Sequence, residues 1–137
     1  MEIKYRDIFI NYSVEGRGNT LVLLHGFTES LEIWDEFSAE ISLDFRVVCV
    51  DLPGHGKSGS FGDMHTMEFM ADCVKAVLDK EGIIECAIIG HSMGGYVALA
   101  FAEKFPVMIK GLGLFHSSAL ADTPEGRSGR EKAIEAI

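Results

Sequence analysis

The pentapeptide Gly90-His91-Ser92-Met93-Gly94 is the part of the sequence whose residue types and spacing point most directly to chemistry. It matches the pattern G-x-S-x-G, in which a serine sits on a strained turn between a strand and a helix and projects its hydroxyl above the sheet. At so tight a turn, side chains at Gly90 and Gly94 would collide with neighbouring backbone, and Gly95 would let the following helix approach the sheet. We therefore predict that Ser92 is a nucleophile and that His91 belongs to its supporting turn.

The segments on either side of this motif supply the structural context that it requires. Cys86 to Gly90 is a short apolar run typical of a buried strand, and Tyr96 to Phe105 has the apolar spacing of a helix that Pro106 stops. The bare pattern recurs by chance, because glycine and serine are common residues. A strand before it and a helix after it favour a nucleophile over an ordinary glycine-rich turn.

A second group of residues, His25-Gly26-Phe27-Thr28, follows directly after the apolar run Thr20 to Leu24. An acyl-transfer enzyme places a loop at this point, and a backbone N–H of the loop stabilises the negative charge that develops on the carbonyl oxygen of the substrate. We predict that the N–H groups of Phe27 and Met93 are the donors of this oxyanion hole. The first two residues of the group would support the loop.

A third group, Asp51 to Gly59, follows the apolar run Arg46 to Asp51 and is rich in glycine and proline. These residues predict a tight loop at the end of the sheet where open α/β folds bind ligands. The stretch Gly54 to Ser58 resembles a phosphate-binding loop in part. The spacing G-x-x-x-x-G-K-S fails, however, because Asp51 stands where the first glycine is required, which argues against a nucleotide site.

The hydrophobic pattern predicts an α/β fold with a mostly parallel sheet and flanking helices. Unbroken apolar runs predict buried parallel strands, and spacings of three and four residues predict the helices between them. A hairpin is expected at the start of the chain and one more strand after the third helix. The expected elements are a hairpin of Met1 to Tyr5 and Asp7 to Val14, strands at 20–24, 46–51, 86–90 and 109–115, and helices around 34–41, 67–78, 96–105 and from 122 onward.

The three motifs, in this order and on these elements, resemble those of the α/β-hydrolase superfamily over residues 1 to about 120. The resemblance rests on the H-G loop, the D-L-P-G-H-G-x-S loop and G-H-S-M-G-G. It implies a Ser-His-Asp triad in the chain order nucleophile, acid, histidine, with Ser92 forming an acyl-enzyme. It implies no metal and no organic cofactor.

In the family, the acid usually follows the seventh strand and the histidine follows the eighth. Ile109 to Phe115 resembles the sixth strand, and Asp122 to Ile137 resembles the start of the cap over the active site. We therefore expect a partial hydrolase core at 1–120, the beginning of a cap region at 121–137, and the acid and histidine beyond Ile137. The last helix carries an apolar stripe of Ala133, Ile134 and Ile137 without a stop signal, so a truncated N-terminal portion is expected.

One histidine of the chain is a candidate for a base within these 137 residues. His116 follows the strand expected beside that of the nucleophile, so its imidazole could take the proton of Ser92. The alternative is that His116 bonds to neighbouring loops or lines a substrate pocket. Both interpretations stay open at this point.

Composition and charge exclude several classes of function. The net charge of −9 comes without any lysine or arginine block, which argues against nucleic acid and against an anionic membrane surface as partners. The first residues contain no apolar stretch of the kind found in signal peptides or anchors, so a cytoplasmic protein is expected. The cysteines at positions 49, 73 and 86 form no C-x-x-C pair, which predicts reduced, packed thiols and no zinc site.

The leading hypothesis is a serine hydrolase of esterase type that acts on a small-molecule ester or related acyl bond and is inactive as this portion alone. Two alternatives remain: an acyltransferase or C–C bond hydrolase on the same fold, and a non-catalytic binding module. Truncation would leave the strand at Ile109 to Phe115 without its neighbour. We therefore expect a homodimer or strand exchange through this sheet edge, or pairing with a missing C-terminal half.

Overall fold

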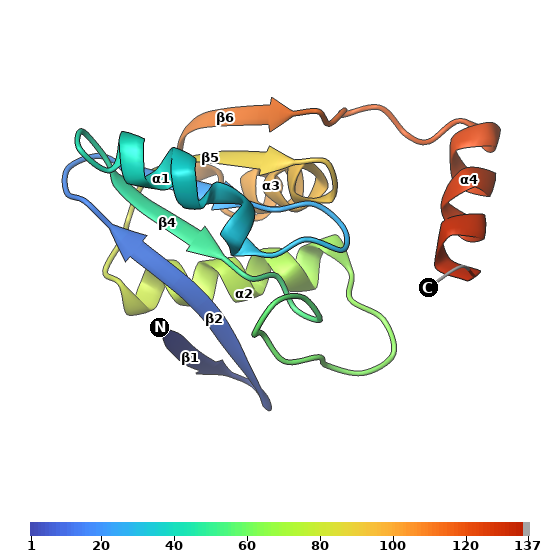
Figure 1. The fold of residues 1–137 in the computed structure, drawn as a ribbon, viewed down its shortest axis with the longest axis horizontal. Coiled ribbons are helices and arrows are strands. Elements are labelled where there is room, and N and C mark those ends of the chain that lie inside the picture. Colours follow the sequence, from blue (N-terminus) through green and yellow to red (C-terminus); the bar gives the residue numbers. More distant parts are fainter. Residues whose placement is uncertain (136–137) are drawn as a thin grey trace.

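The computed structural model describes residues 1–135, whose centre is a sheet of six strands in the order β1-β2-β4-β3-β5-β6 (Figure 1). Strands β1 (Glu2–Tyr5) and β2 (Ile8–Glu15) form an antiparallel hairpin at one edge, and β2 pairs antiparallel with β4. The remaining strands run parallel to one another: β3 (Thr20–Leu24), β4 (Arg46–Val50), β5 (Cys86–His91) and β6 (Ile109–Phe115). The predicted α/β class with a mostly parallel sheet is confirmed.

The two kinds of strand differ in their hydrophobic pattern because they differ in what covers them. In β3, Val22, Leu23 and Leu24 are fully buried, since both faces of the central sheet are covered. In β2, buried Ile8 and Ile10 alternate with exposed Phe9, as expected for a strand with one face toward solvent. The predicted distinction between central strands and edge hairpin is therefore confirmed.

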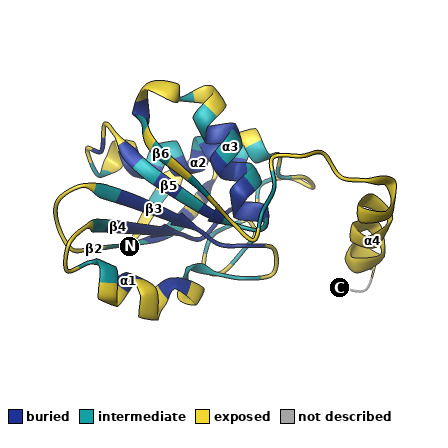
Figure 2. Cartoon of the chain, turned by 90° about the horizontal axis from the view of Figure 1, so that it is seen from above, coloured by how far each residue is buried: buried dark blue, intermediate teal, exposed yellow. Residues whose placement is uncertain are grey.

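Helices cover both faces of the sheet (Figures 1 and 2). Helices α2 (Met67–Lys80) and α3 (Met93–Lys104) pack against one face in the larger core cluster. The short helices η1 (Leu31–Trp34) and α1 (Asp35–Ile41) lie on the other face, where Trp34 packs in a smaller cluster. Helix α3 then leads through η2 (Pro106–Met108) into β6.

Helix α3 begins earlier than the apolar spacing predicts. The prediction started the helix at Tyr96, but its first residue is Met93, directly after Ser92. Two glycines fill the missing turn, and glycine has a low helix propensity that hides the turn from an analysis of apolar spacing. A Cβ at Gly94 would lie 2.5 Å from the carbonyl oxygen of Leu24, so the close packing of α3 on β3 requires glycine there.

Helix α4 (Pro124–Glu135) extends away from the rest of the molecule (Figure 1). Its predicted start is confirmed, since the Thr123 side chain accepts a hydrogen bond from the Gly126 N–H at 3.1 Å. Arg130 ties the helix to α3 through a hydrogen bond of 2.8 Å to the Tyr96 hydroxyl. The predicted apolar stripe packs against nothing in the described part of the chain: Ile134 is 66% exposed, and Ile137 lies outside the described residues.

Burial protects the thiol groups of the chain. The cysteines at 49, 73 and 86 are free and buried, as predicted. Burial raises the pKa of the Cys49 and Cys73 thiols to about 12 and that of Cys86 to about 11. Since the thiolate is the reactive form, these cysteines are structural residues of the core.

We expect all three thiols to resist a thiol-exchange reagent in the folded protein and to react at once in guanidinium chloride. A thiol that ionises at about 12 instead of 9 carries about a thousandfold less thiolate at neutral pH. Absorbance during reaction with a chromogenic disulfide measures the difference. Rapid reaction of one thiol in the folded protein would contradict the burial described here.

Candidate active site

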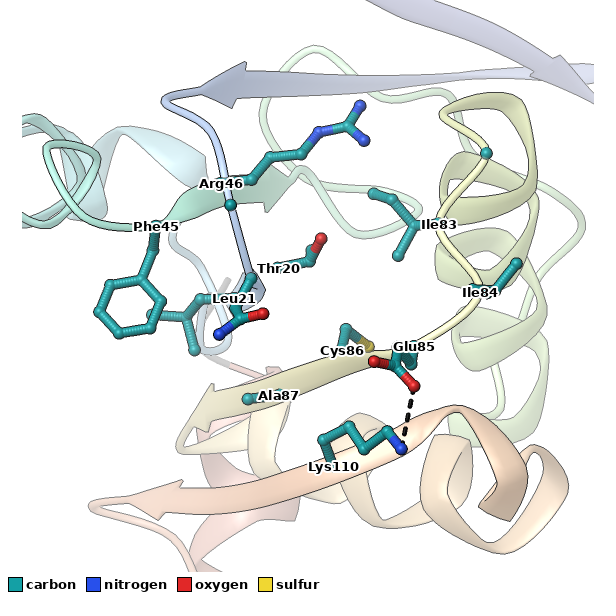
Figure 3. A pocket seen from close by; sticks show the side chains of 13 residues that line it. Thr20, Leu21, Phe45, Arg46, Ile83, Ile84, Glu85, Cys86, Ala87 and Lys110 are labelled. Carbon is teal, nitrogen blue, oxygen red and sulfur yellow. Dashed lines mark ion pairs between the residues drawn. The ribbon is translucent and has the colours of Figure 1, made fainter.

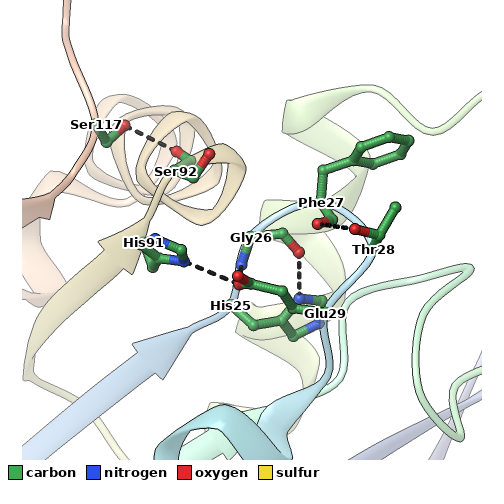
Figure 4. Close-up of polar contacts among 8 residues, drawn as sticks. All are labelled: His25, Gly26, Phe27, Thr28, Glu29, His91, Ser92 and Ser117. Atoms are coloured by element: carbon green, nitrogen blue, oxygen red, sulfur yellow. Dashed lines mark hydrogen bonds and ion pairs between the residues drawn. The ribbon is translucent and has the colours of Figure 1, made fainter. Parts of the chain in front are cut away.

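Ser92 lies on a strained turn between β5 and α3. Its φ of 49° and ψ of −114° place a non-glycine residue at positive φ, a conformation that costs energy and persists only where surrounding contacts hold it. The Ser92 N–H donates to the Phe115 carbonyl oxygen at 3.0 Å. The Ser117 hydroxyl donates to the Ser92 carbonyl oxygen at 2.8 Å (Figure 4). Contacts with the end of β6 thus hold the turn.

The glycines around Ser92 are required by close approach. A Cβ at Gly90 would overlap the carbonyl oxygen of Gly94, so the turn closes only without one. A Cβ at Gly95 would lie 3.3 Å from the Gly90 carbonyl oxygen of β5, which agrees with the expectation that this glycine lets α3 approach the sheet. The same Cβ would also overlap the Ser117 side chain. Gly95 therefore also makes room for the hydroxyl that binds the Ser92 carbonyl.

The N–H of Met93 is the first of helix α3 and forms no hydrogen bond within residues 1–135. Unpaired N–H groups at a helix N-terminus carry partial positive charge and attract anions. The N–H of Phe27, in the loop after β3, is likewise free of hydrogen bonds within the same residues. These are the two predicted oxyanion donors, and neither is bonded to an acceptor in the described part of the chain.

His25 orients the peptide that carries the Phe27 N–H. The imidazole is fully buried, and its Nε2 accepts a hydrogen bond from the Leu52 N–H at 3.0 Å. Nδ1 therefore carries the proton and donates to the Gly26 carbonyl oxygen at 2.7 Å (Figure 4). Burial lowers the pKa of His25, so the ring is neutral at pH 7. Because this peptide is trans, the Phe27 N–H points away from His25.

Glu29 is the residue of this region that the sequence analysis missed. Its Oε2 accepts hydrogen bonds from the Gly26 N–H at 2.6 Å and from His91 Nδ1 at 2.9 Å (Figure 4). Burial would raise the pKa of the Glu29 carboxyl, but these hydrogen bonds bring it below its usual value. The only signal in the sequence was an acidic residue three positions after Gly26. Its partner His91 is 62 positions away.

Asp51 closes the third predicted loop around its own buried carboxylate. Its side chain accepts hydrogen bonds from the Lys57 N–H at 2.8 Å and from the Leu31 N–H at 2.7 Å. The Ser58 hydroxyl donates to the Asp51 carbonyl oxygen at 2.6 Å. The Lys57 N–H and the Ser58 hydroxyl, two groups that would face phosphate in a nucleotide-binding loop, are thus bonded to Asp51.

His116 does not contact the serine hydroxyl in the way a general base requires. Its ring packs at right angles to Phe115, with centroids 4.7 Å apart, and lies 6.2 Å from His91. In the described part of the chain, Ser92 Oγ forms no hydrogen bond with any side chain. The arrangement thus offers a serine and two N–H donors without a bonded base.

Two hollows lie at opposite ends of the sheet. A hollow of about 480 Å³ lies where the parallel strands begin, and the ion pair of Lys110 and Glu85, 2.9 Å apart, flanks it (Figure 3). Ser92 follows the other end of β5, so this hollow does not serve it. Another, of about 410 Å³, is lined by Tyr96, Leu99 and residues 118–122, beside helix α3. Ser92 does not line either hollow.

Within residues 1–135, no cluster of three or more histidine, cysteine or acidic side chains is placed to hold a metal ion. None of the helices in that range is long and apolar enough to cross a membrane.

Comparisons with known proteins agree with this geometry. The family model described as alpha/beta hydrolase fold matches residues 19–127. The pimeloyl-[acyl-carrier protein] methyl ester esterase of Pectobacterium carotovorum is 36% identical over 119 residues, which are 86% of this chain and 45% of that protein. The dihydrolipoyllysine-residue acetyltransferase component of the acetoin cleaving system of Pseudomonas putida is 34% identical over 85% of this chain and 32% of its own length.

Solved structures show the same likeness in three dimensions. A thermophilic esterase from Thermogutta terrifontis superposes with a TM-score of 0.88 and 34% identity, over 95% of this chain and 48% of that one. The chain therefore spans about a third to a half of the length of these relatives. Because the family match covers residues 19–127 and agrees with the fold and the strained serine turn, the chain belongs to the α/β-hydrolase family.

Proposed function

We propose that this chain is the nucleophile-bearing portion of a serine hydrolase of esterase type. The observation that carries the proposal is Ser92 itself, strained at a φ of 49° and followed by the free N–H of Met93 at the start of α3. A serine is held in this costly conformation where its hydroxyl must stand clear of the sheet. The Phe27 N–H is the second donor of the oxyanion hole.

In the proposed reaction, Ser92 Oγ attacks the carbonyl carbon of an ester and the electron pair of the C=O bond moves to oxygen. The N–H groups of Phe27 and Met93 stabilise this oxyanion. The bond to the alkoxy group then breaks, and the alcohol leaves with the proton that a base removed from Ser92. Water releases the acid from the acyl-enzyme in the same way.

The acid and histidine of the triad are proposed to lie beyond Ile137. Residues 1–120 then form a partial hydrolase core, and 121–137 form the start of a cap region. Two observations support this division. Ser92 Oγ has no hydrogen-bonded base within the described residues, and the chain covers only 45% of the length of the esterase relative. We propose a cytoplasmic location and a small-molecule substrate, since the net charge of −9 disfavours nucleic acid and anionic membranes.

An acyltransferase is the second candidate function, and one observation favours it. The relative from Pseudomonas putida, 34% identical, is named as an acetyltransferase component. Both reactions pass through attack on an acyl group and differ in whether water or another nucleophile accepts it. A C–C bond hydrolase and a non-catalytic module remain weaker alternatives, and the second is opposed by the intact serine turn.

Although no base is bonded to Ser92, the oxyanion donors alone should let it react slowly with an excess of fluorophosphonate, and Ser92→Ala should abolish the adduct. Intact-protein mass spectrometry measures the labelling, with Ser117→Ala as a second serine variant and Ser60→Ala as a control on an exposed loop.

Hydrolysis of a short-chain chromogenic ester by the chain alone should equal that of Ser92→Ala, because no base is bonded to the serine. Ester turnover that depends on Ser92 would place a base within the chain, and His116→Ala would then identify it. Absence of any adduct at Ser92 would contradict the proposed nucleophile.

We propose that strand β6 associates through its free edge. The partner is a second copy of the chain, bound by dimerisation or strand exchange, or a missing C-terminal half. The exposed Leu112 and Leu114 of β6 add apolar surface to unpaired backbone groups. Sedimentation should show an apparent mass that rises with concentration. Leu112→Lys should reduce association, whereas Leu43→Lys, at a more exposed site away from the edge, should not. A monomer at every concentration would contradict association between copies.

A further inference from the structure

We propose that Glu29 is a positioning residue of the active site, because its Oε2 joins the Gly26 N–H of the oxyanion loop to His91 beside the nucleophile. The inference rests on the proposed function. Glu29 touches no reacting atom in this arrangement. It acts by holding the Phe27 N–H at a fixed distance from Ser92.

The bridge joins two segments that reach the same end of the sheet on neighbouring strands. Strands β3 and β5 are parallel and paired, with Leu24 opposite Gly90. The loop with Glu29 follows β3, and the serine turn follows β5. One carboxylate oxygen, with donors at 2.6 and 2.9 Å, therefore closes the gap between the two loops directly.

The same bridge fixes the orientation of the oxyanion donor. Two peptide groups flank Gly26: Glu29 binds the N–H of the first, and His25 binds the carbonyl of the second at 2.7 Å. The second peptide also carries the Phe27 N–H. With both bonds in place, this N–H has one direction. Without the Glu29 side chain, the Gly26 N–H loses its partner, and only the Gly26 carbonyl stays bonded, to His25 and at 3.4 Å to the backbone N–H of residue 29.

Close packing transmits any movement of Glu29 to the serine. A Cβ added at Gly26 would lie 2.8 Å from Glu29 Oε2 and 3.2 Å from Ser92 Cβ. The loop backbone is thus enclosed between the carboxylate and the serine, with no free space for readjustment. A displacement of about 1 Å between reacting groups and their donors can slow a reaction about a hundredfold.

The bridge depends on the charge of Glu29, and this gives it a pH dependence. Two titratable groups face the carboxylate, His91 from β5 and His25 from its own loop. Although burial opposes ionisation, hydrogen bonds from His91 and Gly26 hold the pKa of Glu29 below its usual value. A carboxyl with a lowered pKa stabilises the folded arrangement above its unfolded pKa, and this contribution is lost as the pH falls through the folded pKa. The bridge should therefore be complete at neutral pH and dissolve in acid.

The test compares rates of fluorophosphonate labelling at Ser92 in the wild-type chain, Glu29→Ala and Glu29→Gln, with Glu32→Gln as a matched control. Glu32 is an exposed carboxylate three residues along, whose side chain forms no hydrogen bond within residues 1–135. We expect labelling to slow about tenfold to a hundredfold in Glu29→Ala and less in Glu29→Gln, whose side-chain oxygen still accepts. The control should match the wild type. Thermal unfolding of each variant separates this loss from a loss of folding.

A pH series distinguishes positioning from a purely structural role. The ratio of wild-type to Glu29→Gln labelling rates should fall toward one as Glu29 is protonated in acid, whereas a packing role leaves this ratio constant. In parallel, the Gly26 amide resonance should titrate in the wild type with the carboxyl and not in Glu29→Gln. Equal labelling rates in the wild type and Glu29→Ala would overturn the positioning role while leaving Ser92 as nucleophile. If Ser92 is not labelled at all, the proposed function fails, and a Gly26 resonance that does not titrate would overturn the bridge as well.

Discussion

The close approach of helix α3 to the end of β3 is the constraint on which the rest of the site depends. A Cβ at Gly94 would lie 2.5 Å from the Leu24 carbonyl oxygen and 2.6 Å from that of His25, so backbone meets backbone there. Helix α3 must therefore begin at once after β5, which leaves Ser92 alone to make the turn at positive φ. It also brings the first N–H of the helix to the loop that carries Phe27. Strain at the serine and proximity of the donors follow from one packing requirement.

Buried polar side chains hold the loops around this contact in place, because an unpaired polar group away from water would cost free energy. Asp51, 1% exposed, binds backbone N–H groups of two loops. His25, fully buried, joins the Leu52 N–H to the Gly26 carbonyl. These bonds replace the regular hydrogen bonding that loops lack. The site is thus fixed by polar contacts above a sheet that is fixed by apolar packing.

The sequence predicts the features that depend on near neighbours and misses those that depend on distant ones. Apolar runs predict the central strands, alternation predicts the opening hairpin, and the glycines around Ser92 predict the tight turn, because each pattern is local in the sequence. The role of Glu29 depends on His91, 62 positions away, and the contact of Gly95 depends on Ser117. The predicted start of α3, Tyr96, lies three residues after the observed one, Met93, because glycines oppose helix formation in isolation. Packing on β3 nevertheless requires glycine at position 94. Long-range contacts decide these details, and they cannot be obtained from local periodicity.

The order of strands also explains why the two N–H donors and the serine can be held in position without a base. The loop after β3 and the turn after β5 belong to adjacent paired strands, and the strand on the far side, β6, holds the turn through Phe115. Everything that fixes the Phe27 and Met93 N–H groups therefore lies on the neighbouring strands β4, β3, β5 and β6, on the loops that follow them and on helix α3. A base needs only to reach Ser92 Oγ, which forms no hydrogen bond within residues 1–135. Its position can thus be set by a different part of a fold without altering the contacts that shape the oxyanion hole, which is why one nucleophile turn can serve several acyl-transfer chemistries.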